Sequence, residues 1–367
     1  MRFFGGAQRR TRRGREVGAA GRTGTVRPPA GATAELQRVE SRLRAVVSAT
    51  PDPGLARMAI DTVDAGGKRL RPALVLASAT AARGPEAITE RVVDAAAAVE
   101  LLHLASLHHD DVLDAAQVRR GRPSANALWG NHAAVLGGDV LLAHAYRVAA
   151  GLGAPGLDRI SDTLLALCSG QAAESTSQFD CRREVTHYDA SVRGKTATLL
   201  STSCWLGAAT AGAPDDVAEA FAAFGLELGI AFQIVDDVLD LYGHGLQTGK
   251  PAGTDLRAGV YTLPVLIALE RDAALVELLV EGIDEDGRRE VARRVEAAGA
   301  DRRAVACALE HLRAAFAQLD AAACFADGAG RLRAIGKLVL EPLERLGLTS
   351  GPRIRAPVRV APEASVA

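Results

Sequence analysis

The pentapeptide DDVLD occurs twice in this sequence, each time after an apolar run. The aspartates are, in the first copy, Asp110, Asp111 and Asp114 and, in the second copy, Asp236, Asp237 and Asp240. On a helix, residues one turn apart share a face, so each copy places its carboxylates together. Crowded carboxylates repel one another and are costly to bury, and a hard divalent cation removes both penalties.

A pair of such acidic faces is more specific than one. A single DDxxD is equally well explained as a solvated acidic helix end. Two identical copies on two apolar segments instead predict that the carboxylates face each other around one cavity. Mg²⁺ prefers one or two carboxylates together with phosphate oxygens and water, so the pair predicts a diphosphate held through about two or three Mg²⁺ ions.

The lysines also point to a diphosphate site. The chain has four lysines against 39 arginines, and three of the four lie in glycine-flanked loops. They are Lys68 in GGKRLRP, Lys195 in RGKTATLL and Lys250 in TGKPAGTD. This placement indicates a need for compact point charges, with chance placement as the alternative. Arg119 and Arg120 follow the first acidic face, and arginine can bind phosphate through two parallel hydrogen bonds.

The elements that would position these groups are helices. The sequence is rich in alanine and leucine, and aromatic residues make up only 4% of it, a composition that favours packed helices over sheets. Across 34–350, apolar residues recur at spacings of three and four, and loops with Gly and Pro separate the segments. We therefore predict one all-α domain, a bundle of about ten or more helices around a central active-site cavity.

Two loose tails are predicted outside this domain. Residues 1–33 contain eight arginines and one acidic residue, Glu16, without a helical period. This composition is typical of a disordered segment, and a basic arm that touches anionic lipid is the alternative. No aromatic residues alternate with the arginines, so no nucleic-acid partner is expected. Residues 351–367 form the second predicted tail.

The cysteines and the hydropathy favour a cytoplasmic protein. The five cysteines are scattered and form no CxxC pair, as expected for reduced thiols rather than a disulfide framework. The first residues have no apolar stretch typical of a secretory signal. No run of about 18 or more apolar residues occurs, so no membrane span is expected and any membrane contact would be peripheral.

Taken together, these motifs resemble those of the trans-type polyprenyl diphosphate synthases, also called isoprenyl diphosphate synthases. The resemblance covers roughly residues 60–345. It rests on GGKRLRP, HLASLHHDDVLD, RRGRPS, GKTATLL, FQIVDDVLDLY, GKPAGTDL and TLP, in the family's order. It implies the isoprenoid synthase fold, usually as a homodimer, and a Mg²⁺-dependent condensation of isopentenyl diphosphate with an allylic diphosphate.

The resemblance also implies a role for each matching residue. All six aspartates would bind the Mg²⁺ ions that chelate the allylic diphosphate. Further contacts to the allylic diphosphate are implied for Arg119, Lys195 and Lys250. Contacts to isopentenyl diphosphate are implied for Lys68, Arg71, His103 and Arg120. The catalytic set would be Lys195, Thr196 and Gln233, with the oxygens of Thr196 and Gln233 directed at the allylic cation.

Two positions depart from the family pattern. Lysine is frequent two residues before the Thr of TLP and just before the Asp of GKPxGxD, where this chain has Val260 and Thr254. Both changes remove positive charge from the allylic site. His108 and His109 precede the first acidic face, but zinc is not expected, because a zinc site needs Cys or His at three or four positions.

The residues upstream of Asp110 bear on product length. The growing chain is expected to extend along the helix that carries Asp110, so that Ala105, Ser106 and Leu102 form its floor. None of them is aromatic, and no neighbouring aromatic plugs the path unless Tyr146 turns inward. We therefore predict products of about thirty to forty-five carbons, with geranylgeranyl diphosphate as the alternative.

Two other functions would use the same residue types. A class I terpene cyclase shares the aspartate faces and Mg²⁺ but has no need to bind isopentenyl diphosphate, so GGKRLRP and His103 argue against it. A non-catalytic subunit of a heteromeric synthase should have lost aspartates, whereas this chain retains all six.

Overall fold

The structure is a computed structural model that describes residues 33–119, 121–242, 252–322 and 324–349. Apart from Thr33, the two predicted tails lie outside these ranges and stay predictions. Arg120 and Lys250, both predicted from the sequence to contact diphosphate, also lie outside the described residues.

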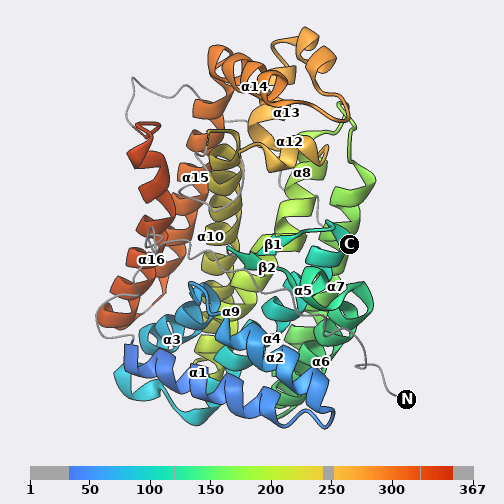
Figure 1. Ribbon diagram of the computed structural model, residues 1–367. Helices are drawn as coiled ribbons and strands as arrows, with labels where there is room; N and C mark the ends of the chain where they lie inside the picture. The colour runs from blue at the N-terminus through green and yellow to red at the C-terminus, as the bar shows by residue number, and fades with distance from the viewer. Residues whose placement is uncertain (1–32, 120, 243–251, 323, 350–367) are drawn as a thin grey trace, which may run out of the picture.

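The described chain is almost entirely helical, so the all-α prediction is confirmed (Figure 1). The α-helices are α1 (Thr33–Ser48), α2 (Pro53–Asp64), α3 (Leu70–Arg83), α4 (Glu90–Leu113), α5 (Ala125–Trp129), α6 (Asn131–Ala150), α7 (Ala154–Thr176), α8 (Val185–Val192), α9 (Thr198–Thr210), α10 (Asp215–Tyr242), α12 (Thr254–Arg257), α13 (Leu263–Leu269), α14 (Glu285–Ala297), α15 (Ala300–Ala321) and α16 (Ala326–Arg345). Shorter helical segments are η1 (Pro85–Ala87), η2 (Arg193–Ala197) and η3 (Ala273–Leu278).

A small hairpin is the one exception to the helical fold within the described ranges. Its strands β1 (Val118–Arg119) and β2 (Arg122–Pro123) pair antiparallel, with Val118 opposite Pro123. The hairpin follows α4 directly, so it stands next to the first acidic face.

Two long helices form the centre of the bundle (Figure 1). α10 packs on α9 and α15, and α4 packs on α6, α9 and α3. Their buried residues belong to two hydrophobic clusters, one that includes most of α10 and one that includes most of α4. Helices that are apolar on nearly all sides need such cover. Because DDVLD lies at the C-terminal end of α4 and close to that of α10, the packing of these two helices positions the two acidic faces.

Local signals determine where some of these helices begin. Asp52 accepts a hydrogen bond from the N–H of Leu55 at 2.9 Å, and Pro53 takes the first position of α2. Asp284 accepts one from the N–H of Gly287 at 2.8 Å and so starts α14. Each cap satisfies a backbone N–H that has no partner inside its helix.

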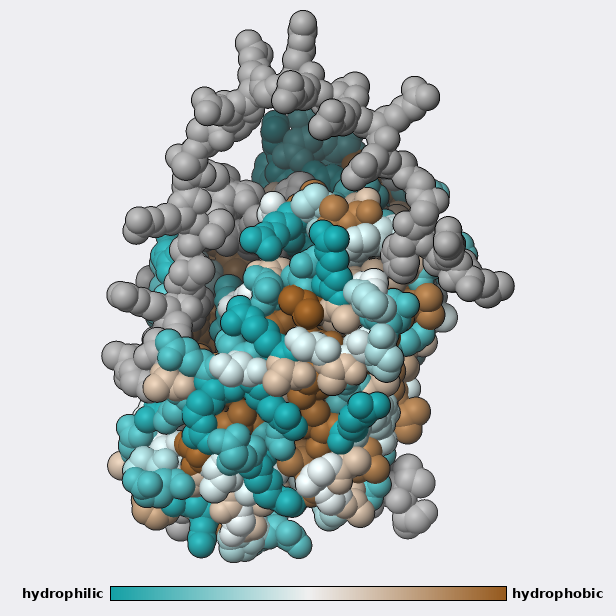
Figure 2. Space-filling model, turned by 60° about the horizontal axis from the view of Figure 1, so that its bottom comes forward, coloured by the Kyte–Doolittle hydropathy of each residue, from teal (hydrophilic) through white to brown (hydrophobic). Residues whose placement is uncertain are grey.

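The face turned toward the viewer in Figure 2 mixes polar and apolar residues. α1, at the lower end in Figure 1, forms several ion pairs with its neighbours, among them the part-exposed pairs Arg38–Glu90, Arg42–Asp94 and Arg44–Asp64. Pairs of this kind stabilise a fold only slightly. α1 is therefore held mainly by apolar residues such as Leu43, which is fully buried in the cluster around α4.

α10 alone among the described helices is long and apolar enough to cross a membrane, judged by length and composition. More than half of its most apolar stretch is buried inside the protein, and α9 and α15 pack against it. Burial of this extent is that of a core helix.

Candidate active site

The first acidic face lies at the C-terminal end of α4. Asp111 is buried, Asp110 is half-buried, and Asp114 caps the helix and is exposed. Arg119 on β1 donates to one oxygen of Asp111 from two nitrogens, Nε at 2.8 Å and Nη2 at 2.6 Å. The hairpin thus brings Arg119, which the sequence predicted for the site, to this face, where its charge compensates a buried carboxylate.

The pKa of Asp110 depends on burial, on the distant Lys195 and on its neighbour Asp114. Burial raises the pKa of its carboxyl, Lys195 lowers that pKa, and Asp114 raises it again. The net pKa is above the ordinary value. Burial thus disfavours the charged form of this carboxyl, and a cation bound at the first face would favour it.

Lys195 and Thr196 lie in η2, a π-helical segment between α8 and α9. Gly170 of α7 lets this segment come close, because a Cβ at Gly170 would lie 2.3 Å from the backbone N of Lys195. Lys195 Nζ donates to Glu174 Oε1 at 2.5 Å. Burial opposes the charge of Lys195, but Glu174 and then Asp110 raise its pKa above the ordinary value. Lys195 is therefore a charged group beside the first face.

The second acidic face lies near the C-terminal end of α10. Asp236 is exposed, Asp237 is buried and Asp240 is half-buried. Tyr188 of α8 donates to Asp237 Oδ2 at 2.5 Å. Burial raises the pKa of Asp237 to about 7, although the hydrogen bond from Tyr188 lowers it. A carboxyl with such a pKa is easily ionised when a cation binds beside it.

Thr196 and Gln233 link η2 to the second face. Thr196 Oγ1 donates to Gln233 Oε1 at 2.7 Å, and Gln233 Nε2 donates to Asp237 Oδ1 at 2.8 Å. Gly229, one turn before Gln233, makes this approach possible, since a Cβ there would lie 2.5 Å from Ala197 Cα. Two successive residues of η2 therefore act at different faces. Lys195 lies beside the first acidic face, and Thr196 donates to Gln233 at the second.

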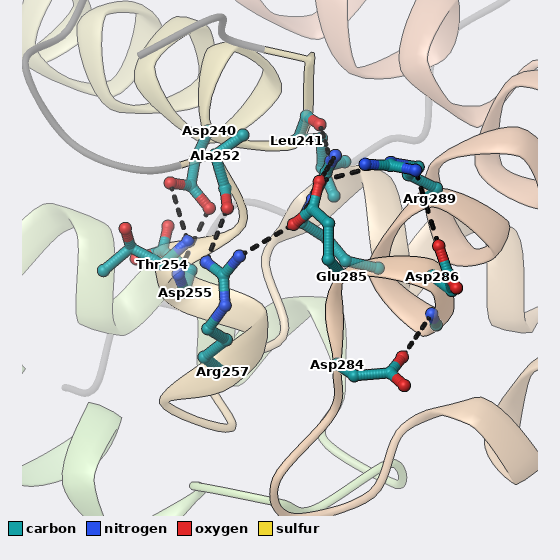
Figure 3. Close-up of polar contacts among 12 residues, drawn as sticks. Asp240, Leu241, Ala252, Thr254, Asp255, Arg257, Asp284, Glu285, Asp286 and Arg289 are labelled. Atoms are coloured by element: carbon teal, nitrogen blue, oxygen red, sulfur yellow. Dashed lines mark hydrogen bonds and ion pairs between the residues drawn. The ribbon is translucent and has the colours of Figure 1, made fainter.

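The carboxylate of Asp240 binds the backbone of the turn formed by residues 252–255 (Figure 3). Its Oδ1 accepts the N–H of Thr254 and its Oδ2 the N–H of Asp255, both at 3.1 Å. Burial raises the pKa of Asp255 well above its ordinary value, and the carboxylates of Asp240 and Asp237 raise it further. Asp255 thus adds a carboxyl group to the second face.

Comparisons with known proteins agree with this geometry. The model of the family described as polyprenyl synthetase matches residues 52–298. The chain belongs to the polyprenyl synthetase family.

Relatives of this polyprenyl synthetase share much of its sequence. Nonaprenyl diphosphate synthase of Mycobacterium tuberculosis is 43% identical over 227 residues, which are 61% of this chain and 67% of that protein. Heptaprenyl diphosphate synthase component 2 of Geobacillus stearothermophilus is 40% identical over 253 residues, which are 69% of this chain and 78% of that protein.

Solved structures share the fold of this polyprenyl synthetase. The polyprenyl synthase of Caulobacter crescentus, complexed with calcium and isoprenyl diphosphate, has a TM-score of 0.78 at 30% identity and covers 84% of this chain and 95% of that one. Heptaprenyl diphosphate synthase of Staphylococcus aureus also has a TM-score of 0.78, at 27% identity, over 84% of this chain and 97% of that one. The predicted isoprenoid synthase fold is confirmed.

The loop GGKRLRP of the synthetase leads into α3. Lys68 is exposed, Arg71 is half-buried in the first turn of α3, and His103 is half-buried on α4. Arg69, which the sequence analysis did not single out, is buried and donates to Glu100 Oε1 at 2.7 Å and to Glu40 Oε1 at 2.6 Å. Arg69 anchors this loop against the bundle, with Lys68 beside it at the surface.

The predicted floor lies in the core around α4. Ala105 and Leu102 are buried, and Ser106 is half-buried and donates to His103 O at 2.9 Å. Tyr146 of α6 is partly buried and packs against the same cluster. Trp205 of α9 packs against this cluster as well, and the role of Tyr146 in product length stays a prediction.

Positive charge reaches the second face from a residue that the sequence analysis missed. Arg183 is buried, and its Nη1 donates to the backbone O of Tyr261 at 3.3 Å, next to Val260. Its guanidinium lies 5.8 Å from the ring centroid of Tyr188, the partner of Asp237. Arg183 thus brings a positive charge next to Val260 and to the partner of Asp237.

The rings of His108 and His109 contact polar groups of the neighbouring helices α2 and α6. Thr62 Oγ1 lies 2.8 Å from His108 Nε2, and Ala134 O lies 3.3 Å from its Nδ1. Burial lowers the pKa of His108. His109 Nε2 lies 3.4 Å from Asp139 Oδ1 of α6. Both rings face α6, since added Cβ atoms at Gly137 and Gly138 would meet them.

The donor groups of both faces fit Mg²⁺. Carboxylate oxygens are the hard ligands that this ion prefers, and burial raises the pKa values of Asp110, Asp237 and Asp255, which a bound cation would lower. In the part of the chain that the structure describes, no three His, Cys, Asp or Glu side chains converge on one point as a closed metal cage would require. An open site completed by substrate oxygens and water matches this arrangement.

Proposed function

We propose that this polyprenyl synthetase condenses isopentenyl diphosphate with an allylic diphosphate to make an all-trans polyprenyl diphosphate. The observation that carries the proposal is the position of η2 between the acidic faces. Lys195 lies beside Asp110 and Asp114, while Thr196 reaches Asp237 through Gln233. η2 thus connects the two acidic faces, because it contains the cation of Lys195 and the hydroxyl of Thr196, which donates to the amide oxygen of Gln233 on α10.

The proposed cofactor is Mg²⁺, about two or three ions per site. Its ligands would be the aspartates of the two faces, Asp110, Asp111, Asp114, Asp236, Asp237 and Asp240. When bound, the ions supply positive charge to the departing diphosphate. Two solved relatives, from Caulobacter crescentus and Corynebacterium glutamicum, contain calcium together with isoprenyl diphosphate, which supports a divalent cation beside this substrate class.

The chain's own residues would stabilise the charges that develop in the reaction. The allylic carbon–oxygen bond breaks, and the electron pair leaves with the diphosphate, where Lys195, Arg119 and Lys250 would oppose the new negative charge. The oxygens of Thr196 and Gln233 would lie near the allylic cation. The double bond of isopentenyl diphosphate attacks that cation and forms a new carbon–carbon bond, which moves the positive charge to the isopentenyl unit. That unit loses a proton to the released diphosphate, and a new double bond forms.

Product analysis tests the proposal and its alternatives. Isopentenyl diphosphate with Mg²⁺ and each short allylic primer should yield linear polyprenyl diphosphates, detected by mass spectrometry. A cyclic hydrocarbon formed from the allylic substrate alone would identify a terpene cyclase. A chain that is inactive alone but active with a partner would identify a subunit of a heteromeric synthase, a possibility raised by the name component 2 of the Geobacillus relative.

The proposed products are medium to long, about thirty to forty-five carbons. Ala105 and Ser106 offer little bulk beside the first face, and Ala105 is buried at the expected floor. The names nonaprenyl, heptaprenyl and solanesyl among the relatives support this range. Geranylgeranyl diphosphate stays the alternative, because several solved neighbours are geranylgeranyl pyrophosphate synthases.

Lys68→Ala is expected to raise the KM for isopentenyl diphosphate about tenfold or more and to leave the KM for the allylic primer nearly unchanged. Lys68 is exposed on a loop held in place by Arg69, so the change removes one charge without disturbing the bundle. Loss of a charge-assisted contact costs about 1.5–3 kcal/mol. Steady-state kinetics with each substrate varied in turn will measure both constants.

Lys337→Ala is the control for this prediction. Lys337 is exposed on α16, outside both acidic faces and the GGKRLRP loop. Its replacement should leave both KM values unchanged. Equal increases in the two constants for Lys68→Ala would contradict separate binding sites for the two diphosphates.

A homodimer is also proposed, through the surface formed by α5, α6 and α7. α6 packs on α5 and on α7, and the three helices expose four large apolar side chains, Leu128, Val135, Leu136 and Leu165. Exposed apolar side chains gathered in this way mark an interaction surface. Leu136→Glu should shift the protein from dimer to monomer at micromolar concentration in sedimentation velocity, because the interface would have to bury a charge.

Val280→Glu is the control for the dimer prediction. Val280 is as exposed as Leu136, 53% in each case, but follows η3 at a distance along the chain from these helices. It should leave the dimer intact. A wild-type protein that sediments as a monomer, or a Leu136→Glu variant that stays dimeric, would contradict this interface.

The compartment proposed for the protein is the cytoplasm, and all five cysteines are free thiols.

A further inference from the structure

The end of α10 is tied to α12 and α14 by a network of ion pairs (Figure 3). Glu285, in the first turn of α14, lies at its centre. Its Oε2 accepts from Arg257 Nη2 at 3.0 Å, and its Oε1 accepts from Arg288 Nη2 at 2.6 Å. The hydrogen bond from Arg288, with the charges of the neighbouring arginines, lowers the pKa of Glu285 to about 2. Glu285 is therefore ionised throughout the neutral range.

Each of the two arginines also binds the backbone of another segment. Arg257 Nη1 donates to the carbonyl O of Ala252 at 2.6 Å. Arg288 Nη1 donates to the carbonyl O of Leu241 at 3.0 Å. Leu241 directly follows Asp240 at the end of α10, and Ala252 opens the turn into α12. A single carboxylate thus connects, through two guanidinium groups, the two segments that meet at Asp240.

Close packing reinforces this connection. Gly253 has a φ of +71°, and a Cβ at this position would lie 2.3 Å from Arg288 Cδ. The N–H of Gly253 donates to the backbone O of Asp240 at 2.7 Å. The Arg288 side chain, largely buried, therefore lies directly against the turn whose next two N–H groups bind the carboxylate of Asp240.

We infer that Glu285 is a positioning residue for the second acidic face. By holding Arg257 and Arg288, it keeps the turn of residues 252–255 against the end of α10. That turn holds both oxygens of Asp240 and keeps Asp255 beside the other aspartates. This role rests on the proposed Mg²⁺-dependent reaction, because its consequence is tighter binding of Mg²⁺ and diphosphate at the second face.

A second network on the same helix distinguishes this role from a contribution to stability alone. Glu290 of α14 accepts from Arg293 Nη2 at 2.6 Å and from Arg294 Nε at 3.1 Å. Hydrogen bonds from these arginines lower the pKa of Glu290 to about 2 as well. Arg294 continues to Asp272, near η3. Part-exposed pairs of this kind stabilise a fold to a similar, small extent, so Glu290→Gln is a matched control for Glu285→Gln.

The first measurement is the Mg²⁺ concentration at half-maximal activity of the full-length enzyme. Glu285→Gln should raise it about three- to tenfold, the range expected for loss of a network of part-exposed ion pairs. Glu290→Gln should leave it as in the wild type. The KM for isopentenyl diphosphate should stay unchanged in both variants, since the GGKRLRP loop lies on other helices. An equal Mg²⁺ requirement in all three proteins would overturn the inference.

The second measurement does not depend on turnover. Mg²⁺ with inorganic pyrophosphate should raise the Tm of the wild type and of Glu290→Gln by the same amount, and that of Glu285→Gln by less. Arg257→Gln should behave like Glu285→Gln, and the double variant should be no worse than either single variant, because the residues act in one network. Additive losses would overturn the inference.

The two proposals can fail separately. A wild type that forms no polyprenyl product under any condition contradicts the proposed function, and the Tm measurement still tests the network. A fully active wild type whose Glu285→Gln variant shows unchanged Mg²⁺ and pyrophosphate responses contradicts only the role of Glu285.

Discussion

Asp236→Ala is expected to lower kcat by at least about 100-fold, and Asp110→Ala to do the same. Each change removes a carboxylate from one of the two acidic faces, and the loss of a group that holds charge at the leaving diphosphate costs about 3 kcal/mol or more of transition-state stabilisation. The effect should be seen in initial rates of product formation at saturating substrates and Mg²⁺.

Asp216→Ala provides the control on the same helix. Asp216 is exposed in the first turn of α10, at the end opposite the second face. Its loss removes a favourable charge at a helix N-terminus, worth about 0.3–1 kcal/mol of stability, and should leave kcat unchanged. Near-normal turnover of either Asp236→Ala or Asp110→Ala, or full activity in excess EDTA, would contradict the assignment of the two faces.

Ala105→Phe is expected to shorten the product sharply while the KM for isopentenyl diphosphate stays nearly constant. Ala105 lies on α4, five residues before Asp110, and is buried in the cluster that also contains Leu102. A phenyl ring at this point would occupy the path along which the prenyl chain grows. Mass analysis of the products from one allylic primer will show the change in the number of isoprene units.

The burial of Ala105 calls for two further variants. Inserting a large ring into a packed core costs about 1–3 kcal/mol of stability. Ala304→Phe, at an equally buried alanine of α15 in the other cluster, should lower stability without changing the product. Ser106→Phe places a ring at a half-buried site one residue closer to Asp110 and should shorten the product at a smaller cost. An unaltered product length in both Ala105→Phe and Ser106→Phe would contradict the path along α4.

The sequence predicts the helical core well, because the buried positions of a helix recur at a regular spacing along the sequence. Apolar residues at spacings of three and four mark α4 and α10, and the repeated DDVLD marks their ends. The resemblance to the polyprenyl synthase motifs, rather than periodicity, implies that Thr196 and Gln233 share one site, and the structure places Thr196 Oγ1 2.7 Å from Gln233 Oε1. Periodicity and repetition are local properties, so they can be read without knowing how the helices pack.

The partners of these residues could not be predicted in the same way. Glu174, Tyr188 and Arg183 come from segments without a motif, and only packing shows that they reach Lys195, Asp237 and the turn next to Val260. Asp255 is a different case, because it lies within TGKPAGTD, but its contact with Asp240 depends on how the turn of residues 252–255 folds against α10. Arg69 lies beside Lys68 in the GGKRLRP loop, and its ion pairs, the buried one with Glu100 and the part-buried one with Glu40, depend on residues from other helices.

The π-helical turn of η2 determines how α8, before it, is rotated relative to α9, after it. A π turn closes its hydrogen bonds over five residues instead of four and so contains one residue more than an α turn. Each helical residue advances the side-chain direction by about 100°. Deleting one residue between Arg193 and Ala197 would turn everything on its N-terminal side by that angle relative to α9. Tyr188 of α8, which lies on that side, could then no longer meet Asp237, so the extra residue sets the rotation of α8 relative to α9 on which the second acidic face depends.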